Sequence, residues 1–138
     1  MSADTKSTAK YVEGIGRRKT ATARVRLTPA SSTSISINGK DISEYFKHQA
    51  QINRVQEVLD TPEAGVETYT ISVHISGSGL SAQADAIRLG IARALVEEKA
   101  DRRTTLKKEG YLKRDPRAVE RKKFGLRKAR KRPAWSKR

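Results

Sequence analysis

The sequence predicts an α+β protein with one compact body and a long basic extension. Residues 20–27 and 66–75 alternate apolar and polar side chains with the period of two that is typical of half-buried strands. Residues 82–99 instead repeat apolar side chains every four residues, which indicates a long helix. Charge is divided unevenly: residues 1–101 hold 13 basic and 12 acidic side chains, and residues 102–138 hold 17 and 3. We therefore expect a disordered leader (1–10), a globular body (11–110) and an extended tail (111–138).

Composition excludes several classes of protein. The chain has no cysteine, so it has neither a disulfide framework nor a thiolate metal site. No apolar run approaches the ~18 residues that a membrane-spanning helix needs. The leader is polar and contains Asp4, which is unlike the apolar centre of a secretory signal. These features favour a cytoplasmic protein.

A β-hairpin is expected at the start of the body. Residues 11–16 form a short strand, and residues 20–27 form a second strand whose inward positions are Ala21, Ala23, Val25 and Leu27. Three basic residues lie between the strands, and we call them the basic corner: Arg17, Arg18 and Lys19. This corner is either a solvated loop or an RNA contact, and the basic tail in the same chain favours RNA.

The middle of the body should alternate strand and helix. Residues 34–37 predict a strand that ends at the turn signal Asn38-Gly39. Asp41 fits an N-cap with Glu44 three residues later, so a short helix should reach residue 46. A helix over residues 49–59 and the strand over 66–75 follow. His48 lacks a recognisable catalytic companion and His74 lies on the polar face of its strand, so we interpret both as ordinary exposed histidines.

Small residues run along the long helix predicted over residues 82–99, for which Ser81 is the expected N-cap. A glycine in a helix costs about 1 kcal/mol relative to alanine. Close approach of the helix backbone to the sheet would compensate for that cost. The stripe consists of Ala82, Ala86, Gly90 and Ala94. Asp101 should begin a shorter helix that Gly110 ends.

A glycine loop at residues 77–83 joins the last strand to the long helix. It could be a nucleotide-phosphate loop of a small-molecule kinase, a contact to nucleic-acid phosphate, or a tight turn. The loop lacks the Gly-Lys-Ser/Thr of a P-loop, and the chain has no second domain for a substrate. We therefore set the nucleotide interpretation aside and leave the other two open.

The tail has few apolar residues and no hydrophobic period, so it cannot bury enough surface to order itself alone. Phosphates of a nucleic acid are the expected partner, because each neutralised phosphate releases counterions. The aromatic side chains of Phe124 and Trp135 could stack on bases or remain solvated. The candidate RNA-binding residues of the tail are Lys113, Arg114, Arg117, Arg121, Lys122, Lys123, Arg127, Lys128, Arg130, Lys131 and Arg132.

Three motifs in order give the chain a resemblance to bacterial small-subunit ribosomal protein nine. They are residues 14–20 (GIGRRKT), residues 83–95 (QADAIRLGIARAL), and a tail that closes on Ser136, Lys137 and Arg138. The resemblance covers residues 11–138. Two positions depart from the family pattern, which usually has a glycine where Ser78 stands and often a basic residue where Leu80 stands. Both departures weaken an extensive phosphate contact by the glycine loop.

The resemblance implies a fold and a role. The fold would be a two-layer sandwich with a mixed four-stranded sheet, packed helices and a left-handed β-α-β crossover. The protein would bind small-subunit rRNA and neighbouring proteins in the subunit head, and its last three residues, 136–138, would reach the peptidyl-site tRNA. It would be no enzyme and would hold no cofactor or metal. The alternative is a free nucleic-acid-binding or membrane-surface protein with a basic arm, but the tail lacks the amphipathic face that a membrane binder needs.

Overall fold

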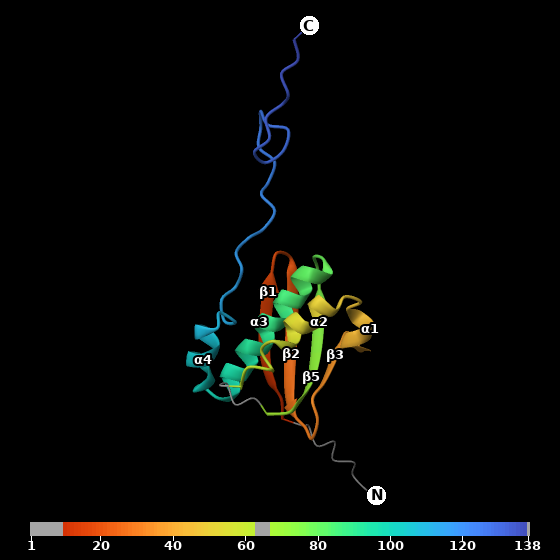
Figure 1. Cartoon of the computed structure of the whole chain (residues 1–138), viewed down its shortest axis with the longest axis vertical. Coiled ribbons are helices and arrows are strands. Elements are labelled where there is room, and N and C mark those ends of the chain that lie inside the picture. Colours follow the sequence, from red (N-terminus) through yellow and green to blue (C-terminus); the bar gives the residue numbers. More distant parts are fainter. Residues whose placement is uncertain (1–9, 63–66, 138) are drawn as a thin grey trace, which may run out of the picture.

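A five-stranded sheet with helices packed on one face forms the body (Figure 1). This architecture confirms the predicted α+β class. The computed structural model describes residues 10–62 and 67–137. The strand order is β1-β2-β5-β3-β4. The strands are β1 (Val12–Arg18), β2 (Ala21–Pro29), β3 (Ser34–Ile37), β4 (Lys40–Asp41) and β5 (Tyr69–Ser76). The helices are α1 (Ile42–Tyr45), α2 (Gln49–Gln56), α3 (Leu80–Glu98) and α4 (Arg102–Lys108).

The sheet is mixed. β1, β2 and β5 pair antiparallel, whereas β3 pairs parallel to β5. Parallel neighbours need a crossover connection, and here it runs through α1 and α2. The resemblance implied four strands. The fifth, β4, has two residues and arises because the turn at Asn38 and Gly39 folds the chain back onto β3.

The core lies between the sheet and the helices. Inward-facing residues of β2 and β5 are buried as the period-two pattern predicts, and the side chain of His74 points outward and is exposed. His48 is also exposed, at the start of α2. Phe46, Val55 and Val58 complete the core from the segment that contains α1 and α2. None of the helices in the described part of the chain is long and apolar enough to cross a bilayer.

Glycines let α3 lie directly against β1. A Cβ built on Gly16 would lie 1.8 Å from the carbonyl oxygen of Ala86, and one on Gly14 would lie 2.3 Å from that of Gly90. A Cβ on Gly90 would in turn lie 2.7 Å from a methyl carbon of Val25. The predicted close approach of the small-residue stripe is therefore confirmed. The helix stripe is matched by small residues on the strand below it.

Several predicted boundaries were wrong. α3 begins at Leu80 with Gly79 as its N-cap, not with Ser81, because Gly77 and Ser78 take positive φ and complete the turn earlier. α2 ends at Gln56, and residues 57–60 continue as turns. β1 runs to Arg18, so the hairpin turn consists of Lys19 and Thr20 alone. Three expectations fall outside the described residues: the leader up to residue 9, Val66 in the strand predicted over 66–75, and Arg138.

α4 fastens the start of the tail to the body. Its Arg102 is buried and donates hydrogen bonds to Tyr69 and to Glu98. At its other end, Gly110 has φ 83° and donates to the carbonyl of Lys107, while Tyr111 donates to Leu106. These two bonds form a Schellman motif, as the expected glycine stop requires. From residue 112 to 137 the chain has no helix or strand, and it runs away from the body (Figure 1).

Candidate nucleic-acid interface

Strand alternation divides the basic corner between two sides of the sheet. Gly14, Gly16 and Arg18 share the side that faces α3, whereas Arg17 lies on the other side. Arg17 and Lys19 are exposed, but the side chain of Arg18 is only 15% exposed. The three neighbours in sequence therefore occupy different environments. Two remain open to a partner, and one takes part in a network within the protein.

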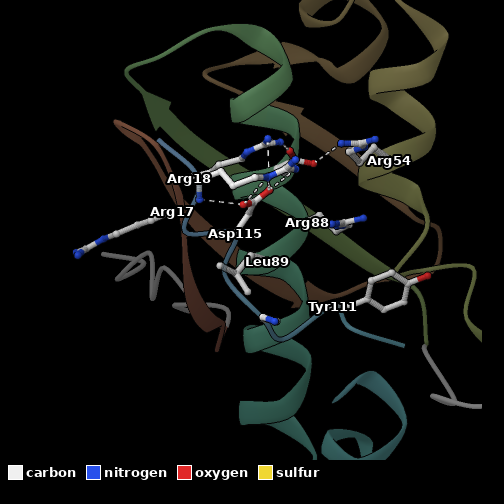
Figure 2. Close-up of a pocket in the computed structure, with 10 residues that line it drawn as sticks. Arg17, Arg18, Arg54, Arg88, Leu89, Tyr111 and Asp115 are labelled. Carbon is white, nitrogen blue, oxygen red and sulfur yellow. Dashed lines mark hydrogen bonds and ion pairs between the residues drawn. The ribbon is translucent and has the colours of Figure 1, made fainter. Parts of the chain in front are cut away.

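That network is a chain of ion pairs from the body to the tail (Figure 2). Asp85 of α3 binds both Arg18 and Arg54, with 2.8 Å from Arg54 Nη1 to its Oδ1. Arg18 reaches in turn to Asp115, with Nη2 at 3.4 Å from Oδ2. Asp115 also pairs with Arg117, whose Nη2 lies 2.8 Å from the same oxygen. Two carboxylates thus hold three guanidinium groups in fixed positions.

Asp115 forms the ion pair that holds the first residues of the tail against the body. Hydrogen bonds from the side chain and then the backbone N–H of Arg117 hold the pKa of this carboxyl well below its ordinary value, and the charge of Arg18 lowers it further. Asp115 is therefore ionised at neutral pH. Arg18 connects it to Asp85, which is only 8% exposed. The first residues of the tail consequently leave the body in a defined direction.

A pocket of about 160 Å³ lies beside this network. It is lined by residues from β1, α2, α3 and the start of the tail, and basic side chains predominate. Figure 2 shows Arg18 and Asp115 at its centre, whereas Arg17 points away from it. The lining residues are Arg17, Arg18, Arg54, Asp85, Arg88, Leu89, Tyr111, Lys113, Asp115 and Arg117. We call this the tail-root pocket.

The other two arginines of the hairpin share one carboxylate, which offsets half of their charge. Glu13 lies on the outward face of the sheet and binds Arg24, with 2.8 Å between Nε and Oε1, and Arg26 at 3.4 Å. The hydrogen bond from Arg24 is the main cause that lowers the pKa of Glu13, and the nearby positive charges add to it. This pairing leaves the outward face less basic than its arginines suggest.

The basic side chains of the tail are almost all solvent-exposed. Lys123 is the exception among those described: it is half-buried and pairs with Glu120, which also binds Arg130 at 2.9 Å. Gly125, at φ 73°, allows the turn between them, so residues 120–131 fold into a small loop. The exposed candidates are Lys113, Arg114, Arg117, Arg121, Lys122, Arg127, Lys128, Arg130, Lys131 and Arg132.

The end of the tail is free of the body. Phe124 and Trp135 are 99% and 83% exposed, so both rings are available for stacking. Ser136 and Lys137 are exposed as well. These residues have no part in the core. In the protein without RNA these side chains are exposed, as the side chains of an RNA-binding extension must be.

The geometry of the glycine loop favours the turn interpretation. A Cβ on Gly77 would lie 2.4 Å from the carbonyl oxygen of Thr20, and φ of Gly77 is 88°. The side chain of Gln83 donates to the carbonyl of Gly77 and accepts from Tyr45, which holds the loop in place. No residue from 77 to 83 lines the tail-root pocket. The glycines are thus explained by backbone conformation and close packing.

Sequence patterns did not indicate the tail-root pocket. Arg54 and Arg88 are single charges on two separate helices, and only the packing of α2 on α3 brings them together. Asp85 gave the one available signal, because it is a carboxylate inside an otherwise apolar and small-residue stretch of helix. A buried carboxylate needs a cationic partner. That requirement could have pointed to an arginine opposite it.

The fold and the charge define a class: a small α+β protein that carries a long basic extension. A profile of the family Ribosomal protein S9/S16 matches residues 16–138. The small ribosomal subunit protein uS9 of Thermosynechococcus vestitus is 54% identical over 127 residues, which cover 91% of this chain and 90% of the relative. That of Gloeothece citriformis is 50% identical over 141 residues, covering 98% and 97%. That of Mycobacterium tuberculosis is 46% identical over 127 residues, covering 92% and 83%.

The chain therefore belongs to the Ribosomal protein S9/S16 family. The similarity extends over the body and the whole tail, so it includes the basic corner and the closing residues. Membership gives the protein a structural role in the ribosome and not an enzymatic one. The resemblance drawn from the three sequence motifs is confirmed.

Proposed function

We propose that this protein binds the rRNA of the small-subunit head, and that its tail continues through the RNA to the peptidyl-site tRNA. The observation that carries the proposal is the segregation of charge. Residues 1–101 have a net charge of +1 and residues 102–138 have +14. A chain that places nearly all of its charge on an exposed extension is suited to a polyanion that surrounds it.

The body supplies the fixed part of the interface. Arg17 and Lys19 are exposed at the hairpin, and Arg18 lies just below them in the ion-pair network. Phosphate contacts of this kind set position and orientation and carry no sequence information. The body would thus dock first, with neighbouring head proteins completing its surroundings in the cytoplasmic ribosome.

The tail supplies most of the affinity. Its exposed cations contact phosphates as the chain orders along the RNA, and counterion release offsets the lost chain entropy. The proposed division is a leader (1–10), an rRNA-binding body (11–110) and a tail (111–138). Ser136, Lys137 and Arg138 form the proposed tRNA contact, through two cationic donors and one hydroxyl.

Salt dependence tests the proposal directly. If ten tail cations contact phosphates, a log–log plot of affinity for small-subunit rRNA against salt should have a slope of about −7 to −9. A variant that ends at residue 116 should lose most of that slope. Co-sedimentation with small subunits through a high-salt wash gives the matching assembly readout. A truncated protein with the full slope would place the electrostatic contacts on the body instead.

A further inference from the structure

We propose that the tail-root pocket binds one phosphodiester group of an RNA backbone, with Arg54, Arg88 and Lys113 as its donors. The inference rests on the proposed RNA-binding function and assigns a site within it. Arg54 comes from α2, Arg88 from α3 and Lys113 from the tail, so the body and the tail hold the phosphate together. None of these groups belongs to the basic corner.

Charge in the pocket favours a single anion. Six cations and two carboxylates line it. Arg17 points away from the pocket (Figure 2), so it is left out of the count, which leaves five cations. Glu57 is included because it pairs with Arg88 at 3.0 Å, which makes three carboxylates. The net charge around the pocket is then two positive charges. A phosphodiester carries one negative charge. The carboxylates of Asp85 and Asp115 do not repel it strongly, because each is held between two arginines.

The two arginine donors are held in place by ion pairs, and each keeps N–H groups that have no partner in those pairs. A guanidinium has five N–H groups, and Arg54 and Arg88 each spend one nitrogen on a carboxylate. The guanidinium of Arg88 also lies 5.6 Å from the ring centre of Tyr111, which limits its motion. Lys113 is exposed and makes no ion pair with any residue that the structure describes. The two restrained arginines lose little entropy when an anion binds, whereas Lys113 must be ordered by the anion.

One residue that lines the pocket has a buried donor without an acceptor. Arg18 binds carboxylates with Nη1 and Nη2, but its Nε is buried and bonds to no described group. A buried donor without an acceptor costs free energy. Arg18 therefore lines the pocket with part of its hydrogen-bonding capacity unused. The volume of about 160 Å³ exceeds the ~30 Å³ share of one liquid water, so a group of several atoms can enter.

A backbone phosphate fits the surroundings better than a free one. Lys113, Arg114 and Arg117 continue from the pocket into the tail. An RNA strand that follows the tail therefore passes the pocket mouth, and its phosphate arrives tethered to other contacts. A free phosphate ion would be held only by the contacts within the pocket.

Matched charge-removal variants of the full chain test the site. The pocket variant is Arg54→Gln with Lys113→Gln, and the control is Arg103→Gln with Lys47→Gln, two exposed positions outside the pocket. For small-subunit rRNA, the pocket variant should flatten the log–log salt slope by about 0.7–0.9 more than the control, the contribution of one phosphate. An equal change in both variants would overturn the proposal.

Two further measurements keep the outcome clear. Lys113→Gln alone, compared with Lys47→Gln alone, avoids the loss of a partner for buried Asp85 if the double variant fails to fold. Arginine Nε–Hε NMR signals of Arg18, Arg54 and Arg88 should shift with dimethyl phosphate. Shifts with inorganic phosphate alone, together with an unchanged RNA slope, would make this a free-anion site and reject the RNA assignment. A wild-type protein that does not bind the rRNA would instead reject the proposed function.

Discussion

Single residues decide how the tail begins. The last 37 residues contain only three acids, and two of them, Asp115 and Glu120, each bind two cations. In a segment suited to phosphate, a carboxylate weakens binding unless it has another use. Here Asp115 connects the body to the tail, and Glu120 closes a loop within the tail. Both carboxylates therefore hold basic side chains in position.

Replacing Asp115 by asparagine should loosen the start of the tail and leave the body intact. The variant loses the ion pairs to Arg18 and Arg117, while the core residues keep their contacts. Backbone ¹⁵N relaxation should show greater motion over residues 113–118, with an unchanged melting temperature. Glu109→Gln makes the same charge change at an exposed position without an ion pair in the described network, and it should leave those residues as ordered as before. Equal relaxation in both variants would refute the link.

The same carboxylate predicts a pH dependence. Its pKa is lower in the folded protein than its ordinary value of 3.8, so the contact stabilises the tail root at and above that pH. The stabilisation is lost as pH falls through the lowered, folded-state pKa. A ¹³C carboxyl titration should find Asp115 still ionised at pH 3 in the protein and less so in an Arg117→Gln variant, because hydrogen bonds from Arg117 are the main cause of the lowered pKa. Identical titration curves would contradict the network.

At the scale of elements, packing of α3 on β1 is the contact that fixes the body. Backbone atoms of the two elements approach so closely that a Cβ has no room at Gly14 or Gly16. Small residues on the helix and glycines on the strand are both required, since either partner alone would leave a gap or a clash. The close fit also places Asp85 and Arg88 of α3 beside Arg18 of β1. Core packing therefore determines the geometry of the tail-root pocket.

Gly16→Ala should destabilise the body strongly. The added Cβ would lie 1.8 Å from a backbone oxygen of α3, which cannot rotate away, so the helix must shift. We expect a cost of about 3 kcal/mol or more, at the upper end for overpacked cores. Urea unfolding measures it. The control is Gly79→Ala, where nothing lies within 4 Å and φ is −91°, so the only expected cost is that of a poorer N-cap, about 1 kcal/mol. Similar costs at both positions would refute the close contact.

At the scale of the whole molecule, the protein has a packed body and an extended tail. The body buries its apolar residues between sheet and helices, whereas most of the tail's side chains remain exposed. The Schellman motif and buried Arg102 end the body at α4. Beyond that point, RNA would have to supply the surface against which the tail orders.

Deleting residues 136–138 should weaken peptidyl-site tRNA binding without preventing assembly. The proposed contacts of these residues are to tRNA backbone, and their loss should cost roughly 1–3 kcal/mol together. Dissociation from programmed small subunits should therefore accelerate about equally for initiator and elongator tRNAs. The control, Arg127→Gln with Lys128→Gln, removes two cations higher in the tail and should leave tRNA dissociation unchanged. An unchanged off-rate for the deletion would remove these residues from the site, and an effect on one tRNA alone would exclude a backbone contact.

The sequence by itself determined the elements and the separation of charge. Period-two patterns located β2 and β5, small residues located the buried stripe of α3, and the charge count located the tail, because each of these depends on neighbours along the chain. The end of α2 and the start of α3 were less well predicted, and for α3 the reason is that positive φ at Ser78 cannot be inferred from residue type. Three motifs in order were enough to indicate the family.

Only the tertiary structure decided what the charges do. Arg18 was one of three consecutive basic residues, and strand alternation turned it toward α3 while its neighbours stayed in solvent. Arg54, Asp85 and Asp115 lie at least 30 residues apart in sequence, and they meet because α2, α3 and the tail root pack at one end of β1. Ion pairs between distant segments have no local pattern, because the partner of a charge is chosen by the fold and not by its neighbours in the chain.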